Sequence, residues 1–169
     1  TIERIGGNLT DHYDPSSRTL RLSQGVADST SLTALGVAAH ETGHALQHRD
    51  AYKPLVLRTA VVPTVSIGSN LSWPLFLIGL IFDWQPLITL GIVFFLLTVL
   101  FTLITLPVEF NASKRAMTAL SSGGYLDADE LDGAGRVLKA AAMTYVAAAL
   151  TAVLQLLRLL ALSNRRRDR

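Results

Sequence analysis

The feature that most restricts the fold of this chain is a run of 22 residues without a charge, Leu87–Val108. As a helix, this run is long enough to cross the roughly 30 Å hydrocarbon core of a bilayer, so it predicts a transmembrane segment. A second apolar run, Thr59–Phe82, precedes it, and the sequence Asp-Trp-Gln-Pro at 83–86 favours a turn at a membrane interface. The two runs together predict a membrane hairpin, which returns the chain to the side that it left.

A third segment, Ala140–Leu157, is apolar and rich in alanine, and it lies between Lys139 and Arg158. It predicts a third spanning helix, with a buried helix in a soluble part of the protein as the alternative. The composition agrees with a membrane protein, since 50% of the residues are hydrophobic and only 17% are charged. The basic residues within 165–169 follow an apolar run and therefore favour a charged stop at the membrane surface over nucleic-acid binding.

The N-terminal region has the pattern of a β-hairpin. Residues 2–10 and 18–23 flank a turn-forming stretch, and Leu20 and Leu22 alternate with polar residues as in a half-buried strand. Because the chain begins with Thr1 rather than Met and opens without a signal-peptide pattern, we expect it to be a fragment or a processed piece.

Two shorter helices are predicted outside the apolar runs. Residues 31–47 show helical spacing of apolar positions after a cluster of serine and threonine that can cap a helix. Residues 109–120 predict a separate helix, which the sequence Ser-Ser-Gly-Gly ends, and residues 125–135 predict a polar linker with acidic residues that can cap the next helix.

The helix predicted at 31–47 contains the sequence His-Glu-Thr-Gly-His. Two histidines four residues apart on a helix point to the same side, so His40 and His44 can bind one metal ion. Glu41 lies next to the first histidine, where its carboxylate can act as a general base on a metal-bound water. A chance match is expected in only about 0.2 per cent of chains with four His and four Glu at this length, so two histidines that are merely buried and hydrogen-bonded are the weaker interpretation.

A catalytic zinc ion has three protein ligands and an open fourth position, so a third ligand must come from elsewhere in the chain. The chain has no cysteine, which leaves His, Asp and Glu as ligands. Glu109 is the best candidate, because it directly follows the predicted membrane hairpin on the side of the His-Glu-Thr-Gly-His helix. His48, His12 and Asp50 compete with it, although His48 lies one further turn along the helix, too far for the same ion as His40.

Three further residues are candidates for supporting roles. Ser113 lies one turn after Glu109 and could hydrogen-bond to a metal ligand. His12 and Asp14 lie in the predicted hairpin loop, from which they could approach the site and donate to a transition state or support a ligand.

Three segments resemble those of the YugP-type bacterial membrane zinc metallopeptidases, namely residues 8–15 (NLTDHYDP), 40–48 (HETGHALQH) and 106–113 (LPVEFNAS). The resemblance runs over essentially the whole chain, and the motifs taken together are specific. It implies a multi-pass protein of the bacterial cell membrane with its active site on the cytoplasmic side. Positive charges near both ends of the predicted spans leave the orientation undecided by themselves.

The same resemblance implies roles for individual residues. In a gluzincin arrangement, His40, His44 and Glu109 would bind one Zn²⁺ ion and Glu41 would be the catalytic base. The chain is also similar to the HtpX and CAAX prenyl protease groups, in which an aspartate stands at the place of Ser113.

The fold that we predict is a mainly α membrane protein, with an H-E-x-x-H zincin-like helical lobe, a small N-terminal β-hairpin and about three transmembrane helices. We expect residues 1–169 to form a single membrane metallopeptidase domain. Its predicted parts are the hairpin with the H-E-x-x-H helix (1–54), the transmembrane hairpin (55–108), the third-ligand helix and linker (109–139), and the last transmembrane helix with a basic tail (140–169).

The function that we predict is that of a zinc-dependent, membrane-embedded endopeptidase, with Glu41 as general base. We expect its substrates to be unfolded or membrane-associated polypeptides that pair with the strand at 18–23, and we expect no nucleic-acid partner. The alternative is a non-catalytic membrane scaffold or metal-handling protein with a structural zinc ion. Glu41 separates the two, since a structural site has four protein ligands and needs no carboxylate beside them.

Overall fold

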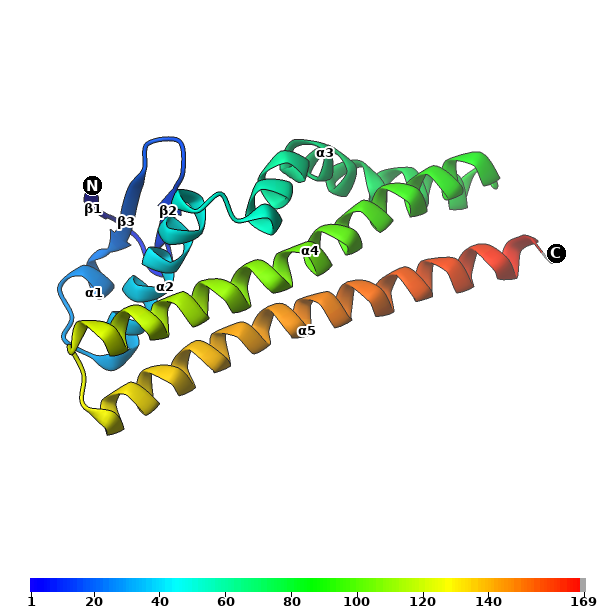
Figure 1. The fold of residues 1–169 in the computed structure, drawn as a ribbon. Coiled ribbons are helices and arrows are strands. Elements are labelled where there is room, and N and C mark those ends of the chain that lie inside the picture. The colour runs from blue at the N-terminus through cyan, green and yellow to red at the C-terminus, as the bar shows by residue number, and fades with distance from the viewer. Residues whose placement is uncertain (168–169) are drawn as a thin grey trace. The chain divides into compact units, whose positions relative to one another are not determined.

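The computed structural model describes the backbone of residues 1–167 and the side chains of residues 1–164 (Figure 1). The fold is mainly helical, with a small sheet at the N-terminus, as predicted. The basic side chains at 165–169, which we predicted to stop the chain at a membrane surface, lie outside the described residues.

The chain divides into two compact units, which are described separately below. Unit 1 comprises Thr1–Val56 and Pro107–Thr144. Unit 2 comprises Leu57–Leu106 and the described chain from Tyr145 onward. The expectation that the whole chain acts as one domain stays a prediction.

The N-terminal sheet of unit 1 has three strands, β1 (Ile2–Ile5), β2 (His12–Asp14) and β3 (Thr19–Ser23). Their order is β1-β3-β2, with β1 parallel and β2 antiparallel to β3. The predicted two-stranded hairpin was therefore wrong, because only β1 forms within the expected first strand at 2–10, and β2 lies in the stretch expected to be a loop. The reason is local, because Gly7 (φ +98°) and Leu9 (φ +57°) have backbone conformations that a strand does not allow.

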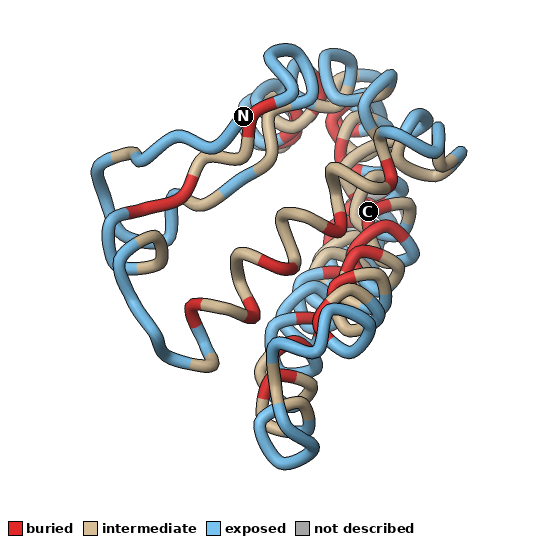
Figure 2. The backbone as a smooth tube through the Cα atoms, turned by 60° about the vertical axis from the view of Figure 1, so that its left-hand side comes forward, coloured by how far each residue is buried: buried red, intermediate tan, exposed pale blue. Residues whose placement is uncertain are grey.

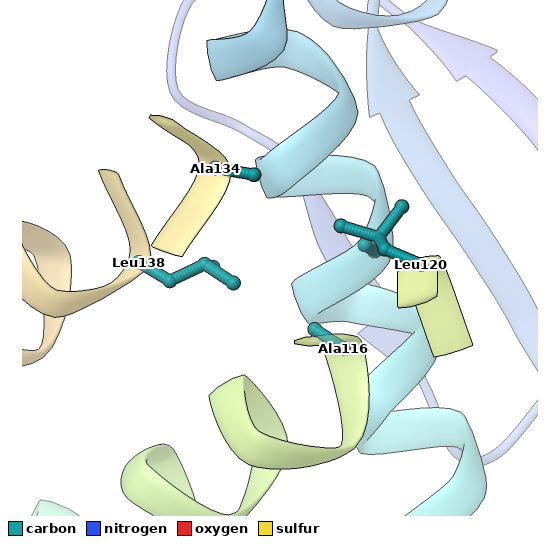
Figure 3. Packing of buried hydrophobic residues seen from close by; sticks show 5 residues of the cluster. Ala116, Leu120, Ala134 and Leu138 are labelled. Atoms are coloured by element: carbon teal, nitrogen blue, oxygen red, sulfur yellow. The ribbon is translucent and has the colours of Figure 1, made fainter. Parts of the chain in front are cut away.

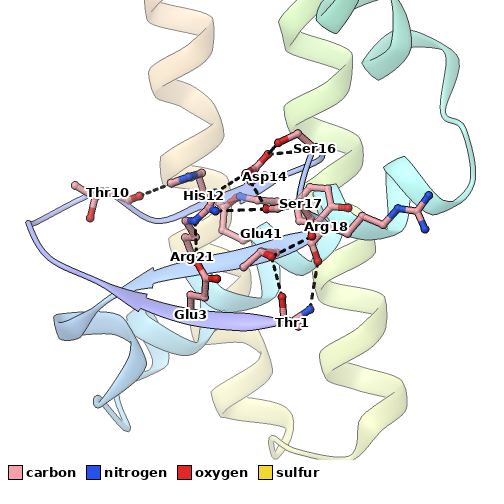
Figure 4. Close-up of polar contacts among 12 residues, drawn as sticks. Thr1, Glu3, Thr10, His12, Asp14, Ser16, Ser17, Arg18, Arg21 and Glu41 are labelled. Atoms are coloured by element: carbon pink, nitrogen blue, oxygen red, sulfur yellow. Dashed lines mark hydrogen bonds and ion pairs between the residues drawn. The ribbon is translucent and has the colours of Figure 1, made fainter.

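Asp14 shapes the turn between β2 and β3. Its carboxylate accepts hydrogen bonds from the hydroxyl and N–H of Ser16 (2.6 and 2.9 Å), the guanidinium of Arg21 (2.5 Å) and the hydroxyl of Ser17 (2.8 Å) (Figure 4). These hydrogen bonds, those of Ser16 first, hold the pKa of Asp14 well below its ordinary value. Asp14 is thus engaged within its own turn.

Helix α1 (Gln24–Ala27) is a single turn, and α2 (Leu32–Arg49) is the helix predicted at 31–47. Ser31 caps α2, because its hydroxyl accepts the N–H of Ala34 at 3.2 Å. The serine cluster therefore begins this helix as predicted, and the helix runs slightly further than expected.

Three long helices follow, α3 (Lys53–Ile81), α4 (Gln85–Gly123) and α5 (Ala128–Arg167). All three have described segments that are long and apolar enough to cross a membrane, judged by length and composition. Three candidate spanning helices were predicted. Pro63 and Pro74 lie inside α3, where they interrupt the backbone hydrogen bonding without ending the helix.

The structure corrects the expected helix break before Glu109. Helix α4 continues through Pro107 and Glu109 without interruption and ends at Gly123, which is followed by Gly124 in a left-handed conformation (φ +64°). A proline removes one backbone hydrogen bond, but a helix of mainly apolar residues can continue past it. The apolar run and the third-ligand segment are therefore parts of one continuous helix.

The expected polar linker at 125–135 is also mostly helical. Asp127 and Glu130 cap the start of α5 reciprocally, since the N–H of Glu130 donates to Asp127 Oδ1 (2.8 Å) and the N–H of Asp127 donates to Glu130 Oε2 (3.1 Å). The acidic residues thus cap the next helix as predicted, but this helix begins at Ala128 rather than at Ala140.

The core of unit 1 joins α2 to the unit 1 parts of α4 and α5. Its buried residues are mostly alanines, with two leucines between them (Figure 3). They are Ala39, Ala116, Leu120, Ala134 and Leu138. Small side chains allow helix backbones to approach closely.

Gly43 marks the closest approach of α2 to α4. A Cβ atom at this position would collide with the backbone carbonyl of Ala112, which is fully buried. Gly43 is therefore needed for packing, because the absence of a side chain allows α2 to lie against the turn of α4 that follows Glu109.

Unit 2 packs large side chains from α3, α4 and α5. Its buried cluster comprises Phe76, Ile88, Phe95, Val99 and Leu159. Large hydrophobic side chains stay exposed on all three long helices, among them Leu77, Leu103 and Leu154. Figure 2 shows the buried and exposed stretches of the backbone in red and pale blue. Extensive exposed apolar surface on helices of this length is suited to contact with lipid.

Candidate metal centre

Two helices of unit 1 bring together the three predicted metal ligands. His40 and His44 lie one turn apart on α2, and Glu109 lies on α4. Oε2 of Glu109 is 3.1 Å from Nε2 of His40 and 3.6 Å from Nε2 of His44. One ligand atom from each residue lies within 4.8 Å of the others. That these three residues bind zinc stays a prediction.

Two of the three donor separations fit a zinc ion. With Zn–N bonds of about 2.0–2.1 Å and Zn–O bonds of about 2.0–2.2 Å, the donors of a tetrahedral site lie about 3.4 Å apart. The separations from Glu109 to His40 and to His44, 3.1 and 3.6 Å, lie on either side of this value, and the donor atoms of all three residues lie within 4.8 Å of one another. A set of two imidazoles and one carboxylate is also the donor chemistry of catalytic zinc sites with three protein ligands.

Burial strengthens the case for a cation at this point. The side chain of Glu109 is 2% exposed, and those of His40 and His44 are 14% and 13% exposed. A carboxylate removed from water is costly unless positive charge or hydrogen-bond donors face it. The imidazole rings meet at 89°, with centroids 4.8 Å apart, so that both can face the same carboxylate oxygen.

The outer nitrogen of each imidazole has its own partner. Nδ1 of His40 lies 3.2 Å from the hydroxyl of Ser113, and Nδ1 of His44 lies 3.0 Å from Oε1 of Gln47. Such contacts orient a metal-binding imidazole and leave Nε2 for the ion. Ser113 was singled out in the sequence, whereas Gln47 was missed although it lies three residues after His44 on the same helix face.

Glu41 lies beside the ligand group, and its carboxylate is held by the sheet. Oε2 of Glu41 accepts the backbone N–H of Tyr13, in β2, at 3.0 Å. Burial raises the pKa of the Glu41 carboxyl above its ordinary value, although the two imidazoles and the Tyr13 N–H act in the opposite direction. Figure 4 shows Glu41 among the polar residues of the sheet. A half-buried carboxylate with a raised pKa is suited to accept a proton near neutral pH.

The competing ligand candidates are engaged elsewhere. Nδ1 of His48 lies 2.8 Å from the hydroxyl of Tyr13, and Nδ1 of His12 lies 2.7 Å from the carbonyl of Thr10. Asp50, at the end of α2, forms ion pairs with Arg49 and with Arg115 of α4. No contact of these residues with the ligand group is seen among the described residues, and the same holds for Asp14.

The predicted substrate-binding strand was assigned wrongly. The strand expected at 18–23 corresponds to β3, which lies in the middle of the sheet, so both of its sides are paired. A peptide cannot pair with a strand whose two neighbours are in place. The strand beside the metal centre is β2, which lies at the edge of the sheet and contacts Glu41 through Tyr13.

Comparison with known proteins agrees with this geometry. Residues 1–164 match the model of a family described as "Putative neutral zinc metallopeptidase". The chain is 48% identical over 167 residues to "Putative membrane protease YugP" of Bacillus subtilis (strain 168). The aligned region covers 99% of this chain and 74% of the relative. No solved structure matches the chain. The resemblance recognised in the sequence is therefore confirmed, and the chain belongs to this family.

Proposed function

We propose that this chain is a zinc-dependent membrane endopeptidase that binds one zinc ion through His40, His44 and Glu109. The observation that carries the proposal is the half-buried carboxyl of Glu41 beside three converging donor atoms. A metallopeptidase needs both features, a cation site and a base within reach of it. Membership of the family supports the same function.

Each residue has a role in the proposed reaction. When bound, a zinc ion acts as a Lewis acid that polarises the scissile carbonyl and makes water nucleophilic near neutral pH. Glu41 accepts a proton from the attacking water and delivers it to the leaving nitrogen of the cleaved peptide. Because Oε2 of Glu41 holds the N–H of Tyr13, Oε1 is the oxygen that takes this proton.

The position of Glu109 along α4 supports a membrane-associated substrate. Glu109 directly follows the uncharged run Leu87–Val108, so the ligand group belongs at the end of a candidate spanning segment. We infer that the substrates are unfolded or membrane-associated polypeptides, with β2 as the edge strand that pairs with their backbone. The relative named a membrane protease and the three apolar helices support a membrane location. A bacterial cell membrane with the active site on the cytoplasmic side is part of the proposal.

A non-catalytic scaffold or metal-handling protein with a structural zinc ion is the alternative. Structural zinc sites are closed by four protein ligands, whereas the group found among the described residues contains three. The carboxyl of Glu41 would also have no role in such a protein. Both observations favour the peptidase.

The decisive experiment compares wild type with Glu41→Gln, each as the full chain purified in detergent. We expect Glu41→Gln to retain about one zinc per chain by elemental analysis and to lose cleavage of an unfolded protein substrate by roughly 10²- to 10⁴-fold. Glu3→Gln is the matched control, because Glu3 is an exposed glutamate that pairs with Arg21. Cleavage retained in Glu41→Gln would exclude the general-base role, and a wild-type chain without zinc would exclude the metal centre.

A further inference from the structure

A buried glutamine connects the two helices that carry the proposed zinc ligands. Gln47 is 0% exposed and lies on α2, three residues after His44. Its Nε2 donates to the backbone carbonyl of Val108 (2.7 Å) and to Oδ1 of Asn111 (3.0 Å), both on α4. Its Oε1 lies 3.0 Å from Nδ1 of His44. The amide thus has a partner at both ends.

These contacts determine which way the amide points. An amide NH₂ group only donates, and the carbonyl of Val108 only accepts, so Nε2 must face α4. Oε1 must then face His44, and because an oxygen here can only accept, Nδ1 of His44 carries the hydrogen. A neutral imidazole with hydrogen on Nδ1 has its lone pair on Nε2, the atom that faces Glu109.

Asn111 is fixed by a further residue. Its Oδ1 accepts a hydrogen bond from Nε of Arg115 at 2.8 Å as well as that from Gln47, so the oxygen end of the Asn111 amide is also defined. Arg115 in turn reaches Asp50, at the end of α2, with Nη1 to Oδ2 at 2.5 Å. A continuous series of side chains therefore runs from the C-terminal end of α2, across α4, to His44.

We propose that Gln47 is a positioning residue, which keeps His44 in the tautomer that can bind a metal ion and holds the turn of α4 carrying Glu109 at the correct distance. The second role follows from Val108, which precedes Glu109 and whose carbonyl Gln47 binds directly. One side chain thus sets the position of two of the three proposed ligands. The inference rests on the proposed function, since it concerns zinc binding by His44 and Glu109.

The alternative is that Gln47 is only a satisfied buried amide. Removal of such a group would lower the stability of the protein, as at any buried polar site, but it would not change the geometry of a bound metal. Loss of a residue that orients a metal-binding histidine instead costs about 10- to 100-fold in metal affinity. The two interpretations therefore differ in a measurement of metal binding rather than of stability.

The test uses Gln47→Leu, Asn111→Ala and a control, Ser72→Ala, in the full chain purified in detergent. Ser72 is also buried, and its hydroxyl donates to the carbonyl of Gly91 (3.0 Å) within unit 2, so its loss removes a buried hydrogen bond away from the site. Zinc affinity is measured by competition with a chelator, and the visible absorption of the Co²⁺-substituted chain reports the ligand geometry.

We expect Gln47→Leu to lower zinc affinity by about 10- to 100-fold and to change the Co²⁺ spectrum. Asn111→Ala should lower the zinc affinity less, because Gln47 keeps its hydrogen bond to Val108. Ser72→Ala should change neither the zinc affinity nor the Co²⁺ spectrum. If Gln47→Leu does not fold, Asn111→Ala decides by the same two measurements. Wild-type affinity and an unchanged Co²⁺ spectrum in the variants would overturn the inference alone, whereas a wild-type chain that binds no zinc would overturn the proposed function with it.

Discussion

Unit 1 and unit 2 both bury polar side chains, but they use them differently. In unit 1, Gln47 and Glu109 make their contacts between α2 and α4, with residues more than sixty positions away in the sequence. In unit 2, the hydroxyl of buried Thr105 donates to a carbonyl four residues earlier in its own helix, and buried Ser72 and Ser163 each take part in one neutral hydrogen bond between helices. The contacts of unit 1 connect several side chains to one group of donor atoms between two helices, whereas those of unit 2 are single hydrogen bonds that satisfy a polar group in an apolar segment.

Unit 1 is the part of the molecule that is suited to metal chemistry. Apolar packing, as in the cluster around Phe76 and Leu159, tolerates small shifts of one helix against another. A metal centre does not, because its donor atoms must lie within a few tenths of an ångström of their places. Changes in unit 1 that move the proposed ligands should therefore alter metal binding, and changes in unit 2 should alter stability alone.

The largest effect is expected for Glu109→Ala, compared with Thr105→Val one turn earlier on α4. Glu109 supplies the carboxylate that both imidazoles face, so its loss should weaken zinc binding by more than about 100-fold, beyond what a supporting residue costs. Thr105→Val removes a hydroxyl that bonds within its own helix and should leave zinc affinity unchanged. Chelator competition on both variants measures the difference, and equal affinities would refute Glu109 as a ligand.

A smaller effect is expected from adding one methyl group at each of two close helix contacts. Gly43→Ala in unit 1 would collide with the carbonyl of Ala112, and Gly91→Ala in unit 2 would collide with the backbone of Phe76. Overpacking of this kind costs about 1–3 kcal/mol, so both variants should unfold at lower temperature. Only Gly43→Ala should also lower zinc affinity, because it separates α2 from the part of α4 that carries Glu109.

The outcome of these two glycine variants tests the comparison of the units directly. Thermal unfolding of the zinc-free chains gives the loss of stability, and chelator competition gives the zinc affinity of the same preparations. If Gly91→Ala weakens zinc binding as much as Gly43→Ala does, the metal centre depends on packing throughout the chain, and the distinction between the two units is lost.

Much of the site could be predicted because its signals are local. His40 and His44 are related by helical spacing alone, and the capping serine at 31 marks where their helix begins. Glu109 required one further step, the return of the chain by a membrane hairpin, and the structure places its carboxylate beside the two imidazoles. Gln47 could have been found by the same spacing argument, since it lies three residues after His44.

The parts that the sequence did not predict depend on distant partners. Parallel pairing of β1 with β3 joins residues with a loop and another strand between them, and no local pattern indicates it. Helix α4 passes Pro107 because the residues after it, such as Ala112 and Ala116, are buried against other helices. When this packing is not known, Pro107 and the charge of Glu109 two residues later indicate the end of a helix.

The smallest effect is expected for Tyr13→Phe, which removes one contact between the sheet and α2 within unit 1. Tyr13 joins β2 to α2 at two points, through its N–H to Glu41 (3.0 Å) and through its hydroxyl to His48 (2.8 Å). Removal of the hydroxyl leaves the N–H in place but loosens the strand, and the loss of one such hydrogen bond corresponds to a decrease in cleavage of about 2- to 10-fold. Zinc affinity should not change, because no described contact joins Tyr13 to a ligand. Tyr125→Phe, at an exposed tyrosine, is the control, and a Tyr13→Phe chain that cleaves as wild type does would show that β2 positions Glu41 through its backbone alone.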